Sequence, residues 1–145
     1  MIKNLQVSSQ DSSINKISVH KIISSLRKEF NLTVSSLSVS FINSAELRHI
    51  NKEYFNHDYE TDVITFNYSK KLKEIDGEIL ISFEEAKLNA KKYNVTYGKE
   101  LCRLLIHGML HLLNFDDKNK ERKKIMQQME NKLINRYNFT LFAGK

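Results

Sequence analysis

Two histidines four residues apart are the clearest chemical feature of this sequence. His107 and His111 lie within the otherwise apolar run 105–113. On an α-helix, residues i and i+4 are neighbours on one face, with Cβ atoms about 5–6 Å apart, so two imidazoles can point at one cation. The spacing therefore predicts a helix that supplies two ligands to a metal ion.

A third ligand is expected just beyond the end of this helix. Asn114 tolerates the left-handed conformation that is common at helix C-termini, and Asp116 and Asp117 follow at once. A turn here brings a carboxylate near the histidines, and two histidines with one carboxylate form an established catalytic zinc set with one open position. The plainer alternative is that His107 and His111 are ordinary buried histidines of a core helix.

Gly108, which lies between the two histidines, is unusual at this position of a helix. Glycine costs about 1 kcal/mol in a helix interior, so its place between the histidines indicates that something approaches the backbone closely there. The metallopeptidase motif H-E-x-x-H has the same histidine spacing, but its glutamate is the general base, and Gly108 occupies that position here. Peptidase chemistry is therefore disfavoured.

The segment that begins at His107 resembles the signature H-G-x-L-H-L-x-G-Y-D-H of the YbeY family, metal-dependent endoribonucleases implicated in ribosomal RNA maturation. The matching positions are His107, Gly108, Leu110, His111, Leu112 and Asp116. Phe115 replaces a family Tyr, Asn114 replaces the usual Gly, and Asp117 stands where the family has its third histidine ligand. Because Asp is a competent zinc ligand, the resemblance implies a ligand exchange at this position.

Two further segments extend the resemblance. Residues 50–66 resemble the family's L-N-x-x-Y-R-x-K-D-x-P-T-D-V-L-S-F, and residues 77–82 resemble its G-D-I-x-I-S strand. In the longer segment the matching residues are Asn51, Tyr54, Asp58, Thr61, Asp62, Val63 and Phe66. Phe55 replaces an arginine that serves function in the family, and His57 stands where the family usually has Lys. A mechanism that depends on the arginine does not carry over to this chain.

The resemblance implies a metal-dependent, single-strand-specific endoribonuclease that acts in 3′-end maturation of small-subunit (16S) ribosomal RNA and in ribosome quality control. It implies one zinc ion per chain, held by His107, His111 and Asp117, and it identifies no general acid or base. The implied partners are ribosomal RNA, the small ribosomal subunit and ribosome-assembly proteins, and no DNA is expected. The alternative is a non-catalytic ribosome-associated zinc-binding protein. Structural zinc usually has four protein ligands, and the three found here favour the enzyme.

Length and composition predict one domain over residues 1–145. A chain of 145 residues with 41% hydrophobic residues can bury a core without disulfides. The single cysteine, Cys102, excludes an intramolecular disulfide and fits a buried thiol in a reducing, cytoplasmic compartment. No apolar run approaches the roughly 20 residues of a membrane span, and the N-terminus lacks the apolar core of a signal peptide.

The net charge of +6 fits a polyanionic partner, although a lysine-rich genome explains it equally well. No aromatic-rich platform is evident in the sequence. We therefore expect RNA to be bound through unspecific phosphate contacts from lysines around the metal cleft.

The hydrophobic pattern predicts four strands and five helices. Strands are expected at 2–8, 36–42, 62–68 and 78–83, and helices at 14–30, from 43 or 44 onward, from a capping box at 82–85 to about 93, at 97–113 and at 118–136. The inner stripe expected for the last helix is Ile125, Met129, Leu133 and Tyr137. This order predicts an α+β fold with a single mixed sheet, helices largely on one side of it, and the metal site at the end of a core helix.

Overall fold

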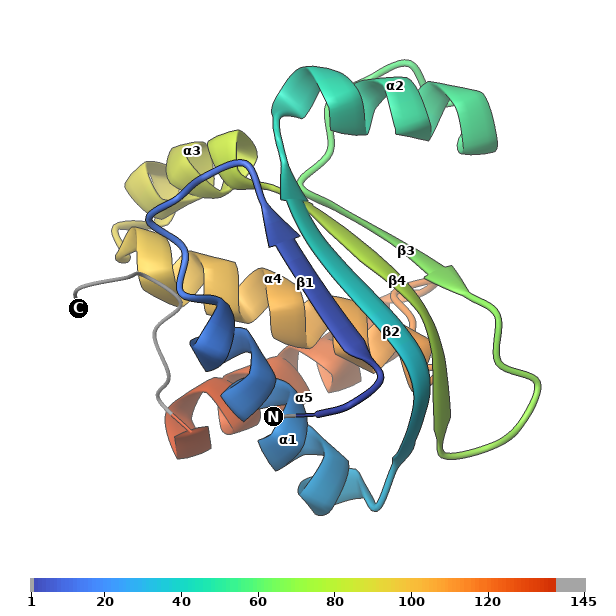
Figure 1. Ribbon diagram of the computed structural model, residues 1–145. Helices are drawn as coiled ribbons and strands as arrows, with labels where there is room; N and C mark the ends of the chain where they lie inside the picture. Colours follow the sequence, from blue (N-terminus) through green and yellow to red (C-terminus); the bar gives the residue numbers. More distant parts are fainter. Residues whose placement is uncertain (1, 138–145) are drawn as a thin grey trace.

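The computed structural model describes residues 2–137, which form one four-stranded sheet and five helices (Figure 1). The strands are β1 (Leu5–Ser9), β2 (Thr33–Ile42), β3 (Val63–Asn67) and β4 (Glu74–Ser82). The helices are α1 (Lys16–Phe30), α2 (Ser44–Phe55), α3 (Phe83–Tyr93), α4 (Tyr97–Leu112) and α5 (Lys120–Tyr137). The α+β class and the order of the elements are as predicted. No helix in this described part is long and apolar enough to cross a membrane.

The sheet is mixed, with strand order β1-β2-β4-β3. β1 and β4 both run parallel to β2, whereas β3 runs antiparallel to β4 and forms an edge of the sheet. β2 begins at Thr33, earlier than its sequence pattern predicts, because an irregularity between Val34 and Ser36 interrupts the alternation of buried and exposed residues. β4 begins at Glu74, where polar residues and Gly77 give the pattern of a loop.

The two faces of the sheet are covered very differently. On one face, α1, α4 and α5 pack over the main core, whose largest fully buried side chains include Phe41, Ile79, Ile81, Ile22, Leu101, Leu104 and Leu105. On the other face, only α2 packs, over a small second cluster made by Ile42, Leu47 and Ile64 (Figure 1). The rest of that second face carries no helix from the described residues.

Helix ends follow the expected local rules. Ser82 is the N-cap of α3, and its hydroxyl accepts a hydrogen bond from the Glu85 backbone N–H at 3.0 Å, as the capping box predicts. Asn114, just after α4, has φ 71°, so the predicted left-handed turn is present. The turn reverses the chain direction directly after the histidine helix.

Gly108 lies where α4 touches the sheet. A Cβ atom on Gly108 would be 2.8 Å from Cγ2 of Ile79, a buried residue of β4. The close approach predicted from this glycine is therefore present, and the group that approaches is the strand itself. The glycine fixes the distance between the histidine helix and the sheet.

We expect Gly108→Ala to destabilise the protein by about 1–2 kcal/mol, because crowding against Ile79 outweighs the roughly 1 kcal/mol by which alanine favours a helix. Urea unfolding measures the loss. The control is the same substitution in an Ile79→Ala background, where the space is open and Gly108→Ala should cost nothing. An equal loss in both backgrounds would contradict this explanation.

The inward face of α5 differs from its predicted stripe. The residues of α5 that the structure buries are Met126, Glu130, Leu133 and Ile134, whereas Ile125 is 48% exposed. Of the predicted stripe, Leu133 is buried and Met129 and Tyr137 pack against the core, so only Ile125 was wrong. The buried face also includes a charged residue, Glu130, at an inward position that the pattern did not predict. Glu130 forms a hydrogen bond with His107, one of the two histidines.

Candidate metal centre

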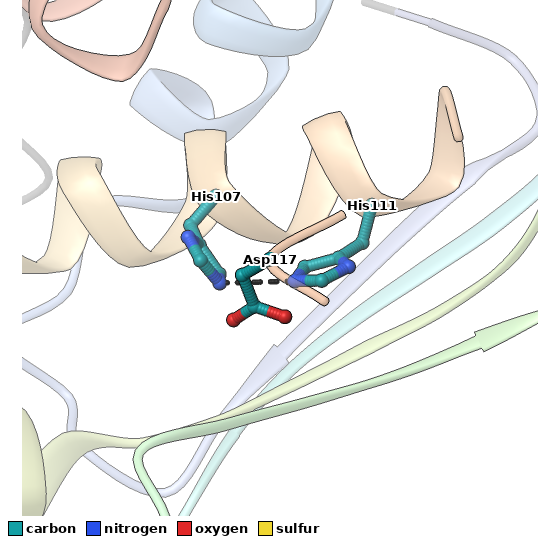
Figure 2. A group of neighbouring side chains, drawn as sticks. All are labelled: His107, His111 and Asp117. Atoms are coloured by element: carbon teal, nitrogen blue, oxygen red, sulfur yellow. Dashed lines mark hydrogen bonds between the residues drawn. The ribbon is translucent and has the colours of Figure 1, made fainter. Parts of the chain in front are cut away.

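The histidine pair and a carboxylate come together at the C-terminal end of α4 (Figure 2). His107 and His111 project from one face of α4, and the chain after the turn at Asn114 returns so that Asp117 lies beside them. One ligand atom from each of the three side chains lies within 4.8 Å of the other two. The structure therefore brings together the three residues predicted to hold a metal.

The spacing of the donor atoms fits one ion. Nε2 of His107 and Nε2 of His111 are 3.1 Å apart. Two nitrogens that are each about 2.0–2.1 Å from a tetrahedral zinc ion lie roughly 3.3 Å apart. Two imidazole nitrogens and one carboxylate oxygen also suit zinc chemically. Within the described residues no fourth His, Cys, Asp or Glu joins this group, so its ligand set is that of an open site.

Glu130 of α5 orients one of the two histidines. Nδ1 of His107 hydrogen-bonds to the Glu130 carboxylate, which is 4% exposed. A proton on Nδ1 leaves Nε2 as the unprotonated nitrogen, and Nε2 is the atom that faces His111. The hydrophobic pattern of α5 did not predict this role for Glu130. Its signal was a glutamate four residues after Met126 and three before Leu133, on the apolar side of a helix.

A partly buried polar network extends from Glu130 beneath the site. The Arg103 guanidinium donates to Glu100 at 2.6 Å and to Glu130 at 3.3 Å, and the hydrogen bond with Glu100 raises the pKa of Arg103. The Asn89 amide in turn donates to Glu100 at 3.2 Å and to Asp62 at 3.0 Å. Side chains from α3, α4, α5 and the segment before β3 are thus joined behind one metal-site histidine.

His111 lies in an environment that favours its neutral form. Burial lowers the pKa of His111, and the nearby His107 lowers it further. Neutral imidazole is the form that binds a metal ion, so less proton release accompanies binding at neutral pH.

A groove of about 520 Å³ opens in front of the three side chains. Its opposite wall is formed by the C-terminal half of α2, the segment between α2 and β3, and β3 itself: Asn51, Phe55, His57, Tyr59, Thr61, Asp62, Val63, Ile64 and Thr65. His57 stacks on Tyr59, with ring centroids 5.2 Å apart. The two longest segments that carry the family resemblance therefore form opposite walls of one groove.

A second hollow, of about 380 Å³, lies against the same site from the side of α5. His107 and Asp117 line it together with Arg103, Lys123 and Gln127, among others. The site is thus open toward both α5 and the α2–β3 segment. An extended ligand can reach it along either wall.

Asp116 forms no hydrogen bond with either histidine in the part of the chain that the structure describes. Its carboxylate accepts hydrogen bonds from the Lys118 backbone N–H at 3.1 Å and from Arg122 at 3.2 Å, and so it shapes the turn into α5. The two neighbouring aspartates therefore have different surroundings. Only Asp117 belongs to the group of possible metal ligands.

We expect Asp117→Ala to lower zinc affinity by at least about 10-fold, since loss of a ligand should cost no less than loss of a group that supports one. Asp117→His should preserve binding, because histidine is an equally good zinc ligand. Asp116→Ala is the matched control and should have a much smaller effect. Competition with a chromophoric chelator measures all three, and the opposite ranking of the two alanine variants would transfer the ligand role to Asp116.

Comparison with known proteins agrees with the resemblance that the sequence motifs indicate. The family model described as endoribonuclease YbeY matches residues 2–138. The chain is 38% identical over 122 residues to the endoribonuclease YbeY of Azobacteroides pseudotrichonymphae, covering 84% of this chain and 87% of the relative. It is 41% identical over 104 residues to that of Chlorobium limicola, covering 72% of each. A solution structure from Thermotoga maritima has a similar fold, with TM-score 0.61, 24% identity and coverage of 92% and 91%.

Proposed function

Because the chain belongs to the YbeY endoribonuclease family, we propose that it is a zinc-dependent endoribonuclease that cleaves single-stranded RNA. The observation that supports the metal dependence best is the convergence of His107, His111 and Asp117 in an open groove. The proposed cellular task is 3′-end maturation of small-subunit (16S) ribosomal RNA and ribosome quality control in the cytoplasm. Its partners are then the small ribosomal subunit and the proteins that assemble it.

The side chains around the site have complementary tasks in this proposal. Zinc supplies, when bound, either a water with a pKa near 7 or a Lewis acid for a phosphoryl oxygen. Glu130 holds the His107 ring in the orientation that presents Nε2. Asp117 would contribute one negative charge and the two imidazoles none. A bound zinc ion with these three ligands would therefore keep a net positive charge, which attracts a phosphate oxygen.

Basic side chains favour the approach of RNA from the side of α5. Lys123 lines the hollow beside His107, and the first turns of α5 also carry Lys120, Arg122 and Lys124. Lysine and arginine attract the phosphate backbone without reading its sequence. The choice of cleavage site must then come from the particle or protein that presents the strand.

The test is cleavage of naked single-stranded oligonucleotides beside small ribosomal particles, with zinc and at several salt concentrations. We expect zinc-dependent cleavage, steep loss of affinity for the oligonucleotides as salt rises, and slight sequence preference on them. His111→Ala is the control, and activity that survives in it indicates a contaminating nuclease. No zinc-dependent cleavage of either substrate would contradict the proposal and favour a non-catalytic, ribosome-associated zinc-binding protein.

A further inference from the structure

Four aromatic side chains gather where α2 meets β3, and we call them the aromatic strip: Tyr54, Phe55, Phe66 and Tyr68. Phe66 is central, with ring centroids 5.3 Å from Tyr54, 5.6 Å from Phe55 and 6.4 Å from Tyr68. The outer three rings are exposed, by 70% at Tyr54, 42% at Phe55 and 53% at Tyr68. A contiguous exposed aromatic surface of this kind marks an interaction site.

The aromatic strip borders the part of the sheet that no described helix covers. Tyr54 and Phe55 end α2, and Phe66 lies on the edge strand β3. Phe55 also lines the groove of the metal site, so the strip is continuous with that groove at one end. At the other end it reaches the outward face of β4, whose residue Glu78 is the cross-strand partner of Phe66.

Carboxylates line β4 beside the strip. Glu74, Asp76 and Glu78 alternate with buried residues and so share the outward face of the strand; we call them the acidic row. None of the three takes part in a salt bridge with a described residue. Their neighbours on β2 are Ser36 opposite Asp76 and Ser38 opposite Glu78, so that strand supplies no opposing charge there. The uncovered face is therefore anionic.

The strip and the acidic row form one surface. The Tyr68 hydroxyl donates to the Glu78 carboxylate at 2.5 Å, and this hydrogen bond raises the pKa of Tyr68 to about 12. A cation placed over the Tyr68 ring would thus lie beside a carboxylate as well. Aromatic faces and carboxylates both attract cations, and together they attract them more strongly.

The charges decide the class of partner. Residues 43–85, which contain α2, β3 and β4, have twice as many Asp and Glu as Lys and Arg, and the lysines at 70, 71 and 73 lie in the loop beyond the strand ends. This surface repels RNA phosphates, whereas α5 attracts them. An arginine guanidinium stacks on aromatic rings and pairs with carboxylates through a planar fork. We propose that the aromatic strip and the acidic row bind an arginine-rich segment of a basic protein partner.

This inference goes beyond the proposed nuclease function and does not depend on it, because peptide binding is measured without RNA. The probe is a fluorescein-labelled octa-arginine peptide, titrated with the full-length protein and followed by anisotropy. We expect the Tyr54→Ala/Tyr68→Ala double variant to bind about 4- to 25-fold more weakly, since each exposed ring contributes roughly twofold to fivefold. Glu74→Gln/Glu78→Gln should weaken binding as well.

Matched controls separate this surface from other exposed groups. Tyr93→Ala removes a ring that is 56% exposed on α3, and Glu121→Gln removes a carboxylate from the first turn of α5. Both should bind the peptide like the parent, and thermal unfolding checks that all variants fold. An octa-lysine peptide should bind more weakly than octa-arginine, because lysine lacks the planar fork.

Four results would overturn the proposal. If octa-arginine and octa-lysine bind equally tightly, the guanidinium does not stack on the rings. If Tyr93→Ala weakens peptide binding as much as the double tyrosine variant does, the peptide has no preference for the aromatic strip. If oligouridine rather than octa-arginine requires Tyr54 and Tyr68, the strip is an RNA platform. If the protein self-associates and loses this in the tyrosine variant, the occupant is a second copy of the chain.

Discussion

Replacing His111 with alanine should lower zinc affinity by at least about 100-fold, since changing a residue that only hydrogen-bonds to a ligand commonly costs about 10- to 100-fold. The parent should hold about one zinc ion per chain. His111 Nε2 faces His107 Nε2 across 3.1 Å, and no other donor group among the described residues is placed to replace it. Elemental analysis after gel filtration and chelator competition measure the loss.

His49→Ala is the matched control for this prediction. His49 is an exposed histidine on α2 that takes no part in the ligand group. It should bind zinc as tightly as the parent, and the His111 variant should lose zinc-dependent cleavage together with the metal. If the His111→Ala protein still holds one zinc ion per chain, zinc does not bind at this end of α4.

Glu130→Gln should lower zinc affinity by about 10- to 100-fold although residue 130 is not a ligand. The glutamine carbonyl accepts the His107 Nδ1–H without the negative charge of a carboxylate, and the glutamine NH2 can instead donate to Nδ1, which favours the wrong imidazole tautomer. The substitution keeps the size of the side chain, so the packing of α5 on α4 is conserved. Calorimetric titration of the metal-free protein with zinc measures the change.

Glu100→Gln separates orientation of the histidine from general support of the buried network. Glu100 and Glu130 are both buried and both bind Arg103, but only Glu130 contacts His107. We expect the two variants to lose similar stability toward urea, whereas only Glu130→Gln loses zinc affinity strongly. Equal losses of zinc affinity would mean that Glu130 acts through packing and not through the histidine.

Much of the fold follows from local rules that the sequence displays. The histidine helix ends just before Asn114 because asparagine accepts the left-handed turn, and Ser82 starts α3 because its hydroxyl caps the backbone. Cys102 is buried, as its apolar neighbours predict. The gathering of His107, His111 and Asp117 needs only this helix and this turn, so it could be predicted from a short segment.

The features that were missed depend on contacts between distant segments. The inward position of Glu130 is favourable only because Arg103 and His107, on another helix, compensate its charge. A hydrophobicity pattern treats every glutamate as exposed and so leaves Glu130 off the inner face of α5. The aromatic strip is likewise hidden, because Phe55 and Phe66 become neighbours only when α2 packs on the sheet.

The close contact between Gly108 and Ile79 also makes one wall of the groove more rigid than the other. It holds the helix that carries both histidines against a central strand, so backbone amides of α4 should exchange with deuterium only when the whole protein unfolds. Residues 56–60 on the opposite wall of the groove are exposed and belong to no helix or strand, so their amides should exchange far faster. The groove in front of the site would then widen and narrow by movement of that wall, while the two imidazoles stay fixed.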